Sequence, residues 1–185
     1  MTDIVVIGVL ELNSIATGIK VLDQIAKAAP VKIIDSRTIC PGKYLIIFTG
    51  QVADVDASLT AGKIAGGGYI VDELFIPNLH SDVIPAIVGT AECNNWNAIA
   101  VVESFSVVAS IEAADSAIKS AKISLVEIRL AIGLGGKSFI KMIGDIHEIE
   151  TAVKTAEKIV EKKGLLCNKT IIPNPHVNVK PFFLF

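Results

Sequence analysis

Two patterns of apolar positions alternate along the first half of the chain. Residues 3–11, DIVVIGVLE, form an apolar run rich in β-branched side chains, which predicts a strand. Asn13 and Ser14 are candidate caps for a helix that follows. Four apolar positions of this helix recur at helical spacing: Ile15, Ile19, Leu22 and Ile25. The first predicted unit is therefore a strand that leads into a helix.

Four more elements complete this half. Residues 31–39 and 43–50 predict two strands that flank a Cys-Pro-Gly turn. Residues 52–65 predict a helix that ends at three glycines, residues 66–68, and residues 69–77 predict a further strand. The order β-α-β-β-α-β is typical of a ferredoxin-like α+β domain, in which helices cover one face of an antiparallel sheet.

The second half of the chain repeats the first. Three segments match in the same order: Ile7–Ala29 with Ile99–Ala121, Pro41–Val52 with Gly135–Ile146, and Phe75–His80 with Ile171–His176. A repeat of this length predicts two tandem domains of the same fold, residues 3–90 and 97–185, joined by a short linker.

Composition excludes several classes of protein. The chain of 185 residues is 51% hydrophobic and 19% charged, with a net charge of -2 and no long basic run, so we expect no nucleic-acid partner. No apolar run is long enough to span a bilayer, and no signal peptide is recognisable, which predicts a cytoplasmic protein without a membrane partner. Small, very apolar repeats often complete their burial against other subunits, so we also expect oligomerisation.

Charged residues recur in both copies of the repeat. Lys27 and Lys119 each follow an aspartate by four residues, Asp23 and Asp115 respectively. Such spacing is compatible with a simple ion pair on an exposed helix. Because the pair occurs in both copies of the repeat, a role in an interface is an equally good interpretation.

The chain shows no recognisable catalytic constellation. His80 and His176 hold the same place in the two copies, after Ile-Pro-Asn, which favours a turn or a subunit contact over proton transfer. The neighbouring carboxylates Asp54 and Asp56 fall on a predicted exposed helix, and no serine or cysteine has an identifiable base. We therefore expect a protein that is not an enzyme.

Residues 131–138, AIGLGGKS, resemble a relaxed phosphate-binding loop. A phosphate loop needs a helix after it, whereas residues 138–143 predict a strand. The equivalent loop of the first copy, TICPGKY, carries a proline. A glycine-rich hairpin is the better interpretation, and nucleotide binding remains a distant alternative.

The repeated motifs resemble the tandem-domain shell proteins of bacterial microcompartments. They are Asp-x-x-x-Lys-x-Ala, the Gly-Lys loops at Lys43 and Lys137, and Ile-Pro-Asn-x-His, and the likeness covers nearly the whole chain. The resemblance implies that three chains form a homotrimeric, pseudohexameric tile of a polyhedral shell. Other shell proteins would then be partners at the tile edges, and an encapsulated redox enzyme is a candidate partner.

The same resemblance implies two sets of site residues. The loops around the central pore would contain Cys40, Pro41, Gly42, Gly133, Leu134, Gly135 and Gly136. The tile edge would contain Lys27, Lys119, Asn78, His80, Asn174 and His176. One departure stands out, because the family often has arginine where this chain has Asn78 and Asn174.

Cys40 is the residue for which the resemblance implies a cofactor. One type of shell protein in this family, with a pore loop similar to TICPGK, is understood to bind one [4Fe-4S] cluster per trimer through one cysteine of each of three chains. Cys93, in the linker, and Cys167, in an apolar strand, are expected not to be ligands. The cluster would serve electron transfer across the shell or repair of enclosed enzymes. The alternative is an open pore for small metabolites.

Overall fold

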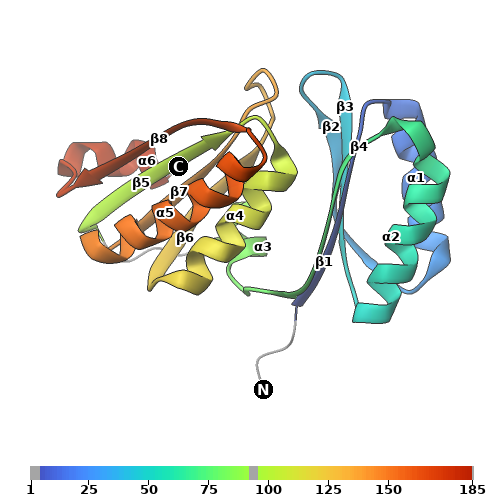
Figure 1. Cartoon of the computed structure of the whole chain (residues 1–185), viewed down its shortest axis with the longest axis horizontal. Helices are drawn as coiled ribbons and strands as arrows, with labels where there is room; N and C mark the ends of the chain where they lie inside the picture. The colour runs from blue at the N-terminus through green and yellow to red at the C-terminus, as the bar shows by residue number, and fades with distance from the viewer. Residues whose placement is uncertain (1–4, 92–95, 185) are drawn as a thin grey trace. The chain divides into compact units, whose positions relative to one another are not determined.

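The computed structural model describes residues 5–91 and 96–184 (Figure 1). These residues form two compact units that divide between Leu79 and His80. Within the described ranges, no helix is both long enough and apolar enough to cross a membrane.

Unit 1 contains one four-stranded antiparallel sheet, in the order β2-β3-β1-β4, with α1 and α2 on one face (Figure 1). Its elements are β1 (Val5–Leu12), α1 (Ile15–Ala28), β2 (Lys32–Ile39), β3 (Lys43–Thr49), α2 (Val52–Gly66), a 3-10 turn (Gly67–Tyr69) and β4 (Ile70–Leu79).

Unit 2 has the same topology, with the order β6-β7-β5-β8 and with α4 and α5 on one face of the sheet (Figure 1). Its elements are α3 (Val83–Val88), β5 (Ala98–Ser104), α4 (Val107–Ser120), β6 (Ile123–Leu130), β7 (Ser138–Gly144), α5 (Ile146–Lys162), β8 (Leu166–Pro173), a 3-10 turn (Val177–Val179) and α6 (Lys180–Leu184). The predicted α+β fold, β-α-β-β-α-β in each half, is confirmed.

The division between the units differs from the boundary expected at residue 90. Residues 80–90 contain α3, which packs on β6 and α4 and so groups with unit 2. Val83 and Ala86 of α3 are fully buried there. The expected linker includes residues 92–95, which lie outside the described part of the chain, and with them Cys93.

Helix α1 begins as expected, but only some of its apolar residues at helical spacing face the core. Ser14 is its N-cap and accepts a hydrogen bond from the backbone N–H of Thr17. The helix buries Gly18, Val21 and Ile25, whereas Ile15 and Ile19 are 41% and 57% exposed. The helix expected from the spacing is confirmed, but spacing alone does not distinguish the residues that face the core, such as Ile25, from exposed ones beside them.

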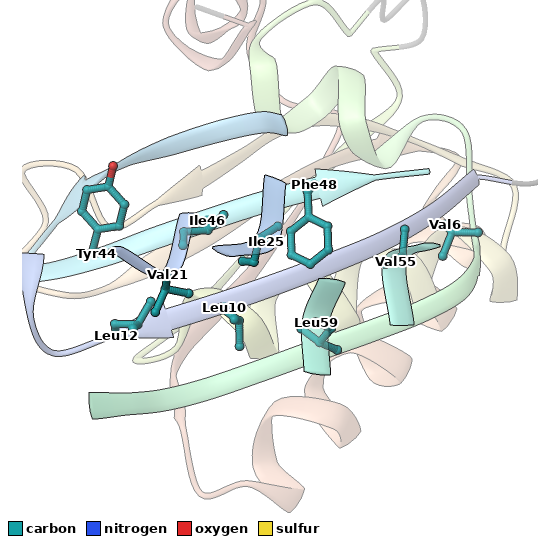
Figure 2. Close-up of a cluster of buried hydrophobic side chains, with 10 residues drawn as sticks. All are labelled: Val6, Leu10, Leu12, Val21, Ile25, Tyr44, Ile46, Phe48, Val55 and Leu59. Atoms are coloured by element: carbon teal, nitrogen blue, oxygen red, sulfur yellow. The ribbon is translucent and has the colours of Figure 1, made fainter. Parts of the chain in front are cut away.

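The core of unit 1 lies between its sheet and its two helices. Figure 2 shows the buried side chains that form it, ten residues drawn from β1, α1, β3 and α2. They are Val6, Leu10, Leu12, Val21, Ile25, Tyr44, Ile46, Phe48, Val55 and Leu59. Residues of β1 and β3 that contribute to this core alternate along each strand, as expected when one face of a sheet packs on helices.

The C-terminal segment packs on its own unit. Phe183 of α6 is 7% exposed and lies in a cluster with Ile99, Val126 and Ile143. Its ring meets the Trp96 ring edge-on, with the ring centroids 5.9 Å apart. Phe183 therefore covers part of unit 2, whereas the neighbouring Phe182 is 83% exposed.

Candidate functional site

The β2–β3 hairpin presents Cys40 at its tip. Ile39 pairs with Lys43 at the end of the ladder, so Cys40, Pro41 and Gly42 form the turn. The Cys40–Pro41 peptide bond is cis. The Cys40 thiol is free and half-buried, while the two residues after it are exposed.

Glycine at position 42 is required by the backbone of this turn. Its φ is +68°, a conformation that side chains with a Cβ rarely adopt. Nothing lies within 4 Å of the position that a Cβ would occupy. The tip of the turn is therefore open at Gly42, two residues after Cys40.

The equivalent β6–β7 hairpin has a longer loop and no thiol. Gly133, Gly135 and Gly136 all have positive φ, between 60° and 89°. The backbone N–H of Lys137 donates to the carbonyl of Leu134 and closes the turn. This loop is a glycine-rich hairpin, as predicted.

A lysine–glutamate ion pair anchors the base of each hairpin. Lys43 Nζ lies 2.6 Å from Glu11 Oε1, and the Glu11 side chain is only 3% exposed. Lys137 Nζ lies 3.1 Å from Glu103 Oε2, and both side chains are more open, at 41% and 34%. The hydrogen bond to Glu103 and the charge of that carboxylate raise the pKa of Lys137 above its ordinary value, and Cys167 in its thiolate form adds a smaller contribution.

These ion pairs were missed in the sequence. Glutamate and lysine are far apart along the chain in both copies, and only the strand pairing brings them together. The signal that could have revealed them is their joint recurrence, since Glu11 aligns with Glu103 and Lys43 aligns with Lys137.

The residues of AIGLGGKS are engaged in ways that do not suit phosphate binding. The Ser138 hydroxyl is fully buried, lies 2.6 Å from the Ser110 hydroxyl and donates to the carbonyl of Ser106. Lys137 is paired with Glu103, and the loop leads into β7, not into a helix. The structure therefore favours the hairpin interpretation over a nucleotide site.

The repeated Asp–Lys pairs differ in burial. Asp23 and Lys27 lie 2.6 Å apart with side chains 52% and 68% exposed. Asp115 and Lys119 are also 2.6 Å apart, but Asp115 is only 8% exposed. It also accepts a hydrogen bond of 2.8 Å from the backbone N–H of His80. Two predicted edge residues, His80 and Lys119, thus meet at one carboxylate.

The remaining predicted edge residues lie at the ends of two strands. Asn78 is exposed in β4, and His176 is exposed after β8. Asn174 has a φ of +49°, and its N–H donates to the carbonyl of Asn97. Asparagine tolerates this left-handed conformation better than most residues, which gives a local reason for asparagine at position 174.

No metal site is complete within the described residues of one chain, because no three His, Cys, Asp or Glu side chains there gather around a common point. Cys40 and Cys167 are both free and half-buried. Cys93 lies outside the described residues. A metal centre at Cys40 would therefore need ligands from further copies of the chain.

Both halves of the chain match the BMC domain, over residues 6–79 and 98–175. The sequence is 41% identical to the bacterial microcompartment shell protein PduT of Citrobacter freundii over 170 residues, 92% of each chain. It is also 38% identical to the carboxysome shell protein CcmK3 of Synechococcus elongatus over 72 residues, which cover 38% of this chain and 69% of the relative.

Two solved structures share the architecture. A microcompartment protein from Desulfitobacterium hafniense superposes with a TM-score of 0.90 and 38% identity, covering 96% of this chain and 99% of the other. The fused permuted hexameric shell protein MSM0275 from the RMM microcompartment gives a TM-score of 0.61 at 18% identity, covering 84% and 81%. The second likeness concerns the fold alone.

Proposed function

This chain belongs to the BMC-domain family of microcompartment shell proteins, and from that premise we propose that its trimer holds a [4Fe-4S] cluster through three copies of Cys40. The predicted tandem shell domains are confirmed by the two matched segments. The protein is a structural tile of a bacterial microcompartment shell, and its role is structural, not enzymatic. Its partners are other shell proteins; that it forms a homotrimer is part of the proposal.

The turn around Cys40 supports the cluster. The observation that carries the proposal is a free, half-buried thiol at a hairpin tip, followed directly by the two exposed residues Pro41 and Gly42. On a three-fold axis, three such thiols would converge. Fe–S clusters are held by thiolates, and three adjacent thiolates need a positively charged centre to offset their repulsion.

The chain's own residues would present the thiol and limit the charge near it. Gly42 keeps the turn narrow, because it has no side chain to meet the neighbouring copies. The ion pair between Lys43 and Glu11 holds the base of the hairpin and neutralises the lysine. When bound, the cluster supplies a one-electron redox centre, which suits electron transfer across the shell or a store for repair of an enclosed redox enzyme.

Removing the Cys40 thiol should abolish iron binding. Protein purified without oxygen is expected to carry about four irons per trimer and to give an electron paramagnetic resonance signal after reduction. Cys40→Ser should lose both iron and signal and still elute as the same oligomer, because Cys40 lies in an exposed turn and not in the core.

Cys167→Ser is the matched control, since Cys167 is also free and half-buried. It should keep the full iron content. Iron that persists in Cys40→Ser would refute the ligand assignment. Wild-type protein that takes up no iron, even after anaerobic reconstitution, would instead favour an open pore for small metabolites.

A further inference from the structure

The chain makes the same histidine turn twice. His80 follows β4 and His176 follows β8, and in each turn the imidazole Nδ1 accepts a hydrogen bond from the backbone N–H two residues later. The donors are Asp82, at 3.3 Å, and Asn178, at 3.2 Å. The two segments that leave these strands therefore start with the same local structure.

The first of these turns is docked on a helix. The backbone N–H of His80 donates to Asp115 Oδ1, and Asp115 is a residue of α4. The α3 segment that follows packs on β6 and α4, where Val83 and Ala86 are fully buried. A charge-assisted hydrogen bond and an apolar contact thus form one joint between a post-strand segment and a helix.

The chain also contains a counterpart of the helix and a counterpart of the segment that form this joint, and both are exposed. Asp23 of α1 is the repeat counterpart of Asp115, and its side chain is 52% exposed. Its hydrogen bonds from Lys27 and Gln24 both go to Oδ2, which leaves Oδ1 for a further donor. On α1, Ile19 is 57% exposed, while its counterpart Ile111 on α4 is fully buried.

The donor half lies after β8. His176 corresponds to His80, and an offset of 96 also aligns Val179 with Val83 and Phe182 with Ala86. Val179 is 42% exposed and Phe182 is 83% exposed, in contrast to the full burial of their counterparts. The segment after β8 therefore has the same histidine turn as the segment after β4, but its apolar residues are exposed. Helix α1, the counterpart of α4, is also exposed at the equivalent positions.

We infer that these halves join between chains: the backbone N–H of His176 in one copy binds Asp23 Oδ1 in a second copy, as His80 binds Asp115. Val179 and Phe182 then cover α1 of that copy beside Ile19. The partner is a second copy of this chain, because the donor and the acceptor reproduce a joint that the chain already makes with itself. The contact is head-to-tail, and a head-to-tail contact closes into a ring when the rotation between successive copies is a whole fraction of a turn, as in the proposed trimer. This inference rests on the proposed trimer and names the surface that would hold it together.

Removing the acceptor should separate the chains. Asp23→Ala in the full-length protein is expected to weaken self-association at least tenfold, measured by sedimentation velocity over a range of concentrations. Lys20→Ala is the matched control, because it removes an exposed charge on the same helix, outside the predicted tile-edge residues, and keeps the carboxylate. It should leave the association nearly unchanged. Far-UV circular dichroism should show unchanged folding for both, since these side chains are exposed.

A crosslink tests the joint directly. With the three natural cysteines replaced by serine, a chain carrying Asp23→Cys and His176→Cys should oxidise to covalent dimers and trimers and to nothing larger. Chains with either change alone should give no such ladder. The joint is overturned if Asp23→Ala assembles like the wild type, if oxidation yields only monomers, or if the chain associates only with a different shell protein. Iron binding that survives an intact Asp23→Ala trimer would reject the joint and leave the cluster proposal standing.

Discussion

Glu11→Ala should lower the free energy of unfolding by about 3 kcal/mol. The Glu11 carboxylate is 3% exposed and lies 2.6 Å from Lys43 Nζ, in the central strand β1 between β3 and β4. Its removal leaves the ammonium of Lys43 without its partner in a site that is largely closed to water, which is far more costly than the loss of an exposed pair. Urea unfolding followed by circular dichroism, at fixed protein concentration, measures the change.

The second copy provides the control. Glu103→Ala removes the equivalent pair, but the Glu103 and Lys137 side chains are 34% and 41% exposed. Water can solvate the remaining lysine there, so we expect a much smaller loss of stability than for Glu11→Ala. Equal losses in the two variants would show that burial of the Glu11 pair has no bearing on stability.

Gly8→Ala should also destabilise unit 1, by about 1–2 kcal/mol. Gly8 lies directly opposite Phe48 in the β1–β3 ladder, and a Cβ at position 8 would come within 2.5 Å of the Phe48 ring (Figure 2 shows this ring within the core). The ring is fully buried, so it has little room to move. Overpacking of this kind outweighs the small gain from restricting glycine in the unfolded chain.

Unit 2 fills the equivalent space with a different pair of residues. At the equivalent positions unit 2 has Ala100 opposite Met142, and both are fully buried. Gly8→Ala combined with Phe48→Met should therefore recover at least half of the stability lost by Gly8→Ala alone. Urea unfolding of the two single variants and the double variant gives the coupling between the sites. Strictly additive effects would mean that the glycine and the ring do not constrain each other.

Local chemistry made much of the fold predictable. Ser14 caps α1, and the glycines after α2 end it, with the N–H of Gly67 bonded to the carbonyl of Lys63. These features depend on residues within one turn of each other. The side of α1 that faces the core was harder to predict, because Ile15 and Ile19 share helical spacing with buried residues yet are exposed. Helix rotation depends on close packing such as that of Gly18 against Tyr44, which spacing does not encode.

The parts of the candidate site that depend on neighbouring residues were predictable for the same reason. Cys40 and the glycine loops stood out because a turn needs particular residues, and Gly42 does have the positive φ that the turn requires. Cys167, by contrast, contributes to the raised pKa of Lys137. Its place in an apolar strand did not suggest that it lies near this lysine.

The sequence by itself determined the duplication, the order of the elements and the position of the two hairpin loops, since repeats, periodicity and turn residues are all visible along the chain. Only the tertiary structure decided which charges meet. Lys43 and Glu11 are 32 residues apart, and His80 and Asp115 are 35 apart. Strand register and the docking of helices determine which charged residues become partners. Both are fixed only when the sheets and helices pack together.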